Sequence, residues 1–245
     1  MIRVAACADV HFGPDSAGRL RPDLEHLAER ADMLLIGGDL TRSGEAAEAR
    51  VLAAELRGLP VPVLAVLGNH DYHQGQEAAV TAALEEVGIS VLEGTGKILE
   101  LAGIRVGVGG VKGFGGGFAG ACATEFGEPQ MKAFVHHTRV AAANLEAALL
   151  ALDAELRIAL LHYSPVPDTL KGERPEIHAF LGSYLLGEAA DRAGADLVLH
   201  GHAHNGTEKG QTDAGSPVRN VSQPVIRRAY ALYTLEPKRA RAKAS

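Results

Sequence analysis

The chain has 245 residues, of which 47% are hydrophobic, and a formal charge of −6. This length accommodates one large α/β domain or two small ones. No apolar run approaches the roughly 18 residues that cross a bilayer, and no signal-peptide pattern follows Met1, so we expect a cytoplasmic protein without a membrane partner. Scattered positive residues argue against a nucleic-acid polymer as partner. The two cysteines, Cys7 and Cys122, indicate neither a disulfide framework nor a thiolate zinc site.

The first half of the chain alternates apolar runs with amphipathic segments. This alternation predicts strands joined by helices. The predicted elements are a strand at 2–8, a helix from 22 to about 30, a strand at 33–36, a helix from 44 to 57 with Ser43 as N-cap, a strand at 61–67, a helix from 76 to 87, and strands at 89–92, 97–101 and 104–109.

Residues 110–127 are rich in glycine. They contain a G-x-G-x-x-G string, but no strand leads directly into it and no helix opens from it, which argues against a dinucleotide site. A mobile flap beside a pocket and a plain surface loop both remain open interpretations. The elements predicted after this segment are a helix at 129–152, a strand at 157–161, a loop at 164–175, a helix at 183–193, and strands at 196–199, 218–221 and 229–235.

The order of these elements indicates α/β architecture with helices on the outer faces of sheet material. No repeat or linker divides the chain, so we predict a single domain over residues 1–236, with a glycine-rich loop and helix inserted around 110–152. Residues 237–245 form a basic, alanine-rich segment, for which we predict a disordered tail.

Polar side chains follow five of the predicted strands. In chain order they are Asp9 and His11, Asp39, Asn69 and His70, His162, and His202 and His204. The carboxyl ends of strands are where α/β folds bind ligands, so these side chains are expected to meet. Without His70 they supply seven oxygen and imidazole ligands, a set that suits two metal ions sharing one carboxylate. His70 can donate a proton near neutral pH, and Asp71 is a carboxylate able to orient that imidazole.

The blocks Asp9-x-His11, Gly38-Asp39, Gly68-Asn69-His70-Asp71, His162 and Gly201-His202-x-His204 resemble the signature of the calcineurin-like metallophosphoesterases. The resemblance implies a four-layer sandwich of two mixed β-sheets flanked by helices, with a dinuclear centre at one edge. By position, it implies a first metal on Asp9, His11 and His204 and a second on Asn69, His162 and His202. Asp39 would bridge the two, and His70 would be the catalytic histidine with Asp71 as its partner.

This resemblance predicts a metal-dependent phosphoesterase, acting on a small-molecule phosphodiester or nucleotide. A metal-bridged hydroxide would attack phosphorus, and His70 would protonate the leaving oxygen. The nitrogen and oxygen ligands favour Mn, Fe, Zn, Co or Ni, with Mn or an Fe/Zn pair preferred. Two divalent ions against the carboxylates of Asp9 and Asp39 give a net positive site that attracts phosphate.

Several alternatives stay open from the sequence. The same centre could serve a nuclease, a phosphomonoesterase or a protein phosphatase; a non-catalytic interaction scaffold and a mononuclear hydrolase of amides or esters are further readings. Arg42, Tyr72 and Tyr163 flank the motifs and are candidate substrate contacts. His200 is expected to be a core histidine or to support the neighbouring ligands, and His136, His137 and Arg139 are expected to be solvated. The oligomeric state stays open.

Overall fold

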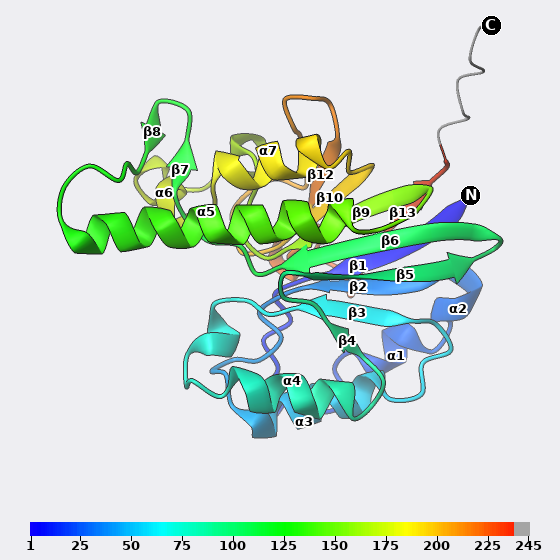
Figure 1. The fold of residues 1–245 in the computed structure, drawn as a ribbon. Helices are drawn as coiled ribbons and strands as arrows, with labels where there is room; N and C mark the ends of the chain where they lie inside the picture. The colour runs from blue at the N-terminus through cyan, green and yellow to red at the C-terminus, as the bar shows by residue number, and fades with distance from the viewer. Residues whose placement is uncertain (238–245) are drawn as a thin grey trace, which may run out of the picture.

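Two β-sheets pack face to face at the centre of the molecule (Figure 1). The computed structural model describes residues 1–237. The first sheet has the spatial order β13 (Ala231–Leu235), β1 (Ile2–Cys7), β2 (Met33–Gly37), β3 (Val63–Val66) and β4 (Ser90–Val91). The second has the order β11 (Lys209–Gln211), β12 (Pro217–Asn220), β10 (Leu197–His200), β9 (Leu156–Leu161), β6 (Ile104–Val111) and β5 (Thr95–Leu101). Both are mixed, because parallel strands are joined at the edges by antiparallel β13, β11 and β5.

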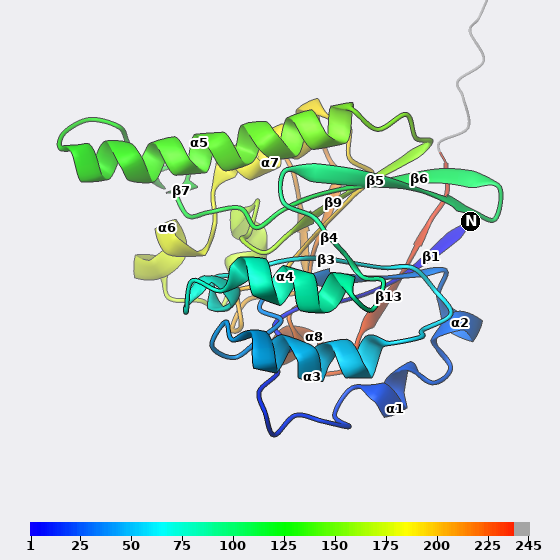
Figure 2. The ribbon, with the colours of Figure 1, turned by 60° about the horizontal axis from the view of Figure 1, so that its bottom comes forward.

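Helices cover the outer face of each sheet (Figure 2). The first sheet is covered by α1 (Arg21–Leu24), α2 (Leu27–Arg30), α3 (Ala46–Leu56), α4 (Glu77–Glu85) and α8 (Gln223–Ile226). The second is covered by α5 (Pro129–Leu150) and α7 (Tyr184–Arg192). The remaining elements are β7 (Gly117–Phe118), β8 (Ala121–Cys122), α6 (His178–Leu181), η1 (His70–Tyr72), η2 (Pro167–Leu170) and η3 (Pro175–Ile177). The predicted four-layer α/β sandwich is therefore confirmed.

Side-chain alternation along β1 shows why these layers form. Ala5 and Cys7 pack into the core beneath the helices, whereas Val4 and Ala6 pack into the core between the sheets. Strand residues alternate sides, so a strand that is apolar at every position can serve two cores at once. This explains why the central parallel strands β2 and β3 are apolar at every position.

Two predicted helices differ from the structure. The helix predicted from residue 22 to 30 is two short helices, α1 and α2, separated at His26, whose φ and ψ of −105° and 22° are not helical. The helix predicted from residue 44 begins at Ala46, with Glu45 rather than Ser43 at its N-cap. Gly44 has a φ of +82°, which is outside the right-handed helical region, so the helix begins after it.

The glycine-rich segment is partly buried. Residues 115–118 are buried, and the N–H groups of Gly116 and Gly117 bind the carbonyl oxygens of Ala179 (2.7 Å) and Gly182 (2.8 Å). The β7–β8 hairpin then projects beside α6, and most residues from 119 to 127 are exposed. Neither a mobile flap nor a plain surface loop describes the whole segment, because its first half is packed against α6.

The single-domain division over residues 1–236 and the insertion at 110–152 stay predictions. The predicted basic tail at 237–245 lies outside the described residues from position 238 onward. Within the described part of the chain, the structure contains no helix with both the length and the apolarity to cross a membrane.

Candidate metal centre

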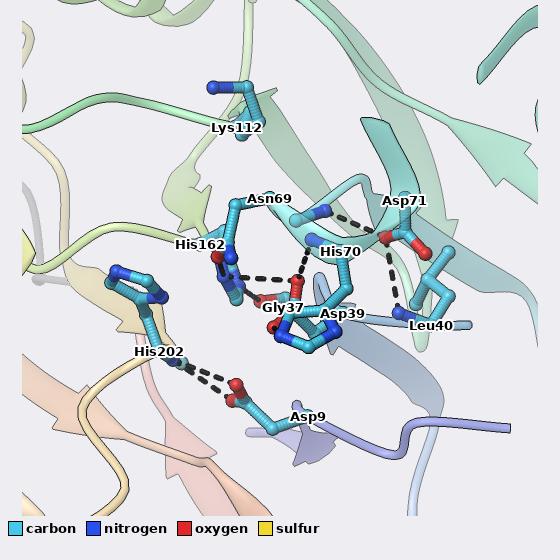
Figure 3. Close-up of polar contacts among 12 residues, drawn as sticks. Asp9, Gly37, Asp39, Leu40, Asn69, His70, Asp71, Lys112, His162 and His202 are labelled. Atoms are coloured by element: carbon cyan, nitrogen blue, oxygen red, sulfur yellow. Dashed lines mark hydrogen bonds and ion pairs between the residues drawn. The ribbon is translucent and has the colours of Figure 1, made fainter. Parts of the chain in front are cut away.

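The predicted ligands converge at one end of the two sheets. Figure 3 shows five of them, Asp9, Asp39, Asn69, His162 and His202. Each predicted ligand lies just past the carboxyl end of a strand: Asp9 and His11 after β1, Asp39 after β2, Asn69 after β3, His162 after β9, and His202 and His204 after β10. The parallel strands of both sheets end on this side, so side chains up to 195 residues apart in the sequence come into contact. The structure brings these residues together in one place, and their roles as metal ligands stay predictions.

At the centre, the backbone adopts conformations that residues other than glycine rarely adopt. Asp9, His11, Asp39 and His202 have φ values of 58°, 42°, 49° and 70°, and the described chain has only two other non-glycine residues with positive φ. Such left-handed conformations cost free energy and cluster at functional sites. The strain therefore marks these four positions independently of their chemistry.

Two glycines allow the loops to approach the carboxylates. A Cβ at Gly68 would collide with the backbone and carboxylate of Asp39, and a Cβ at Gly201 would collide with the carboxylate of Asp9. Only glycine fits where a backbone passes this close to another group. The glycines in the Gly68-Asn69 and Gly201-His202 blocks are thus required by packing around the centre.

The first group of potential ligands consists of Asp9, His11, Asp39 and His204. One ligand atom from each lies within 4.8 Å of the others. His204 Nε2 is 2.8 Å from Asp9 Oδ1, and His11 Nε2 is 3.8 Å from Asp39 Oδ2. These side chains surround a volume that a cation could occupy.

The second group shares Asp39 with the first and adds His162 and His202, again within 4.8 Å. His162 Nε2 lies 3.3 Å from Asp39 Oδ1 and 2.9 Å from Asn69 Oδ1. The Nδ1 atom of His162 is 2.9 Å from the carbonyl oxygen of Gly37, to which it donates as Nδ1–H. This hydrogen bond leaves Nε2 with its lone pair directed at Asp39 and Asn69, as a metal ligand requires.

Burial sets the protonation of these groups. Asp9 is 3% exposed and Asp39 is 1% exposed. Burial raises the pKa of Asp9 to about 6, although its hydrogen bond from His204 opposes the change. Burial lowers the pKa of His202 to about 3 and that of His162 well below the usual range, so both imidazoles are neutral. The hydrogen bond to Asp9 raises the pKa of His204.

This donor set fits divalent cations. Two buried carboxylates lie together, and in the described residues the groups within ion-pairing distance of them are imidazoles rather than lysine or arginine. Buried charge requires a counter-charge, and neutral imidazoles with available lone pairs are metal ligands. The residues present therefore fit bound metal ions better than they fit a metal-free ion-pair network.

The structure corrects the predicted role of Asp71. Its carboxylate is fully buried and accepts hydrogen bonds from the N–H groups of Leu40 (3.1 Å), Thr41 (2.8 Å) and Gly68 (2.7 Å), and from the Thr41 hydroxyl (2.6 Å). Asp71 therefore joins the loops after β2 and β3 and does not orient His70. The sequence placed the two residues side by side, but the η1 turn directs their side chains to different partners.

His70 is held by backbone instead. Its Nδ1 is 2.7 Å from the carbonyl oxygen of Arg42, and its own N–H donates to Asp39 Oδ1 (2.9 Å). With Nδ1–H donating to Arg42, Nε2 faces the centre, 3.9 Å from Asp39 Oδ2. The His70 ring also contacts His11 edge to face at a centroid distance of 4.6 Å. His70 is thus placed beside the ligands.

The flanking residues divide into two sets. The Arg42 guanidinium pairs with Asp15 at 2.6 Å, which gives it a partner outside the centre. Tyr72 and Tyr163 instead line a pocket of about 310 Å³ that also includes Asn69. His137 is exposed, as predicted, and it also lines this pocket and contacts the Phe114 ring edge to face. His200 is fully buried, as expected for a core histidine, and its Nε2 lies 2.8 Å from Thr169 Oγ1.

One pocket residue was missed by the sequence interpretation. Lys112 lies directly after β6 and is 9% exposed, and it lines the same pocket as Asn69. The available signal was a lysine at the end of an apolar strand, in the same position as the ligands of the other strands. Because glycines flank Lys112 in the sequence, the prediction placed it in a loop and not at a strand end.

The family of the chain follows from a comparison of its sequence with family models. The model described as calcineurin-like phosphoesterase matches residues 2–206, which include all the potential ligands. The chain belongs to the calcineurin-like phosphoesterases. The family assignment supports a metal-dependent hydrolase of phosphoesters. No curated protein matches the sequence.

Solved structures share the fold of this calcineurin-like phosphoesterase at low sequence identity. Phosphopantetheinyl hydrolase from Mycobacterium tuberculosis is 17% identical, with 96% of each chain covered and a TM-score of 0.70. A putative 5'-nucleotidase from Staphylococcus aureus is 16% identical, covering 89% of this chain and 48% of its own, with a TM-score of 0.58. GAP50, the anchor in the inner membrane complex of Plasmodium, is 15% identical, covering 91% and 72%, with a TM-score of 0.56. These likenesses concern the fold.

Proposed function

We propose that this protein is a phosphodiesterase of small molecules or nucleotides that uses a dinuclear metal centre. The observation that carries the proposal is that the two potential ligand groups share one carboxylate, Asp39. A shared carboxylate places two cations close enough to act on one phosphoryl group. Asp9, His11 and His204 would hold one ion, and Asn69, His162 and His202 the other.

The protein residues would act as ligands and as a proton donor. When bound, divalent ions would supply Lewis-acid activation and counter-charge for the phosphoryl oxygens. In its protonated form His70 would release a proton from Nε2, because its Nδ1–H is committed to the Arg42 carbonyl and the second ring proton is then at Nε2. That proton faces Asp39 and the centre, where the leaving oxygen needs it. Transition metals are proposed as the resident ions because the ligands are nitrogen and oxygen atoms.

A small substrate is favoured by the pocket next to Asn69. Its volume of about 310 Å³ accommodates a group of nucleoside size. The formal charge of −6 gives no electrostatic attraction for a nucleic-acid polymer. We therefore propose a small phosphorylated molecule as the partner of this site, in a cytoplasmic protein.

The test is a hydrolysis panel with chelator-treated protein supplemented with one metal at a time. The panel contains a phosphomonoester, a phosphodiester, a cyclic nucleotide and a phosphopantetheinyl ester, the last prompted by the name of the Mycobacterium tuberculosis neighbour. We expect the diester or nucleotide to be hydrolysed fastest, with two ions bound per chain by elemental analysis. Preference for the monoester would contradict the diester assignment, and two bound ions without turnover of any substrate would favour an interaction scaffold.

A further inference from the structure

Lys112 carries a buried positive charge beside the centre. Its side chain is 9% exposed in total, and its Nζ donates to the carbonyl oxygen of Gly113 at 3.1 Å. Among the described residues no carboxylate oxygen lies within 4.0 Å of this Nζ. Glu93 is near, but its Oε2 accepts the backbone N–H of Lys112 (3.0 Å). A buried ammonium with one neutral acceptor is costly unless an anion joins it.

Aromatic rings surround this ammonium. Lys112 Nζ is 5.2 Å from the ring centroid of Tyr72, 5.0 Å from that of Phe114 and 5.1 Å from that of Tyr163. Cation–π contacts at these distances stabilise the charge only in part and leave N–H donors available. Desolvation lowers the pKa of Lys112, and the nearby carboxylates of Glu93 and Asp39 oppose this change.

The pocket connects this ammonium to the metal centre. Asn69 lines the pocket and lies 2.9 Å from the ligand His162. In Figure 3, Lys112 lies beyond Asn69 as seen from Asp9. The far wall is Val140, Ala141 and Asn144 of α5. A phosphoester bound at the centre would therefore extend its organic group past Asn69 between the rings and α5.

We propose that this pocket binds the organic group of the substrate, and that Lys112 selects groups carrying a ring and a second anion, as a nucleotide does. The inference rests on the proposed phosphoesterase function and adds the chemistry of the substrate. The rings of Tyr72, Phe114 and Tyr163 would contact the planar part of the ligand, and Lys112 Nζ would donate to its carboxylate or phosphate oxygen. Lys112 then acts as a specificity-determining residue.

The experiment compares two matched diesters, bis(4-carboxyphenyl) phosphate and bis(4-carbamoylphenyl) phosphate, which differ in charge and hardly in shape. The full chain, loaded with Mn²⁺, is compared with Lys112→Met. We expect the substitution to raise KM for the carboxylate ester at least about tenfold more than KM for the carboxamide ester, the factor that one charge-assisted hydrogen bond gives. A bis(4-phosphonophenyl) ester then shows whether phosphate is preferred over carboxylate.

Two further variants make the result specific. Lys132→Met removes an exposed lysine of α5 outside this pocket and should leave the ratio between the two esters unchanged. Asn144→Asp adds a negative charge to the exposed wall of the pocket without a change of size, so it should raise KM for the carboxylate ester selectively. Because position 144 is exposed, this variant tests the pocket even if Lys112→Met unfolds. Equal changes of KM for both esters in Lys112→Met and Asn144→Asp would overturn the proposal.

A binding measurement separates this inference from the proposed function. Calorimetric titration of the chelator-treated chain with the two esters gives dissociation constants without turnover. Tighter binding of the carboxylate ester, lost in Lys112→Met, would support the inference even if the loaded protein hydrolysed neither ester, a result that would count against the proposed function alone. Equal affinity of the wild-type chain for both esters would overturn the inference.

Discussion

The Asp71→Asn substitution tests two roles for this carboxylate. In the structure it joins two loops, whereas the sequence predicted that it orients His70. Asp71 accepts four hydrogen bonds: Oδ1 accepts from the Thr41 N–H and hydroxyl, and Oδ2 accepts from the N–H groups of Leu40 and Gly68. An asparagine has one acceptor oxygen, and its amide group is a donor. In either orientation the amide would face at least one buried backbone N–H.

The magnitude follows from these four contacts. In the better orientation the amide replaces Oδ1, so the Thr41 hydroxyl can rotate to accept while the Thr41 N–H is left without an acceptor. An unsatisfied buried donor costs about 1–3 kcal/mol, and two further bonds weaken because they lose a charged acceptor. We expect Asp71→Asn to lower the free energy of unfolding by about 3 kcal/mol, judged from the same principle.

The assay is urea denaturation of chelator-treated protein at pH 7.5, followed by circular dichroism. The matched control is Asp153→Asn, because the side chain of Asp153 is 87% exposed and pairs with Arg105 at the surface. Such an exposed pair contributes about 0–1 kcal/mol. A loss below about 0.5 kcal/mol for Asp71→Asn, comparable to ordinary surface substitutions, would refute the reasoning, most clearly if the pH profile of turnover shifted instead.

Further predictions concern the centre itself. Asp39→Ala should abolish activity and the binding of two ions together, because Asp39 belongs to both ligand groups; near-wild-type turnover would contradict a shared ligand. His70→Ala should slow turnover by about 10²–10⁴-fold while elemental analysis still finds the metals, and loss of metal would remove its assignment as proton donor. The pKa of Asp9 is raised to about 6 from 3.8, so its contribution to the stability of the metal-free protein is complete below pH 3.8 and is lost as the pH rises through 6. The unfolding free energy of wild type relative to Asp9→Asn should therefore fall by about 2 kcal/mol between pH 4 and 7, and a flat difference would contradict the buried position. Gly201→Ala should weaken metal binding, measured by calorimetry, because its Cβ would displace the Asp9 carboxylate, whereas Gly18→Ala, with open space around it, should not.

The sequence by itself indicated helices over sheet material and the residues that meet at the strand ends, whereas the arrangement in two sheets and four layers was implied by the family resemblance. Strand runs such as Met33–Gly37 are apolar at every position because both faces are buried, and this pattern is visible without coordinates. The rule that parallel strands present their carboxyl ends at one edge then gathered Asp9, Asp39 and His204 into one site. Local periodicity and chain order were sufficient to predict the strands and the meeting of their carboxyl ends, because both are properties of the sequence alone.

Tertiary structure decided which polar groups meet within that site. Asp71 follows His70 directly, yet its carboxylate binds the loop after β2, and the imidazole binds the carbonyl of Arg42. Lys112 and Tyr72 share a pocket although 40 positions separate them. Such pairings depend on how two sheets and their loops pack in space. Sequence spacing does not specify the direction of a side chain in a turn, so these contacts could be found only in the folded chain.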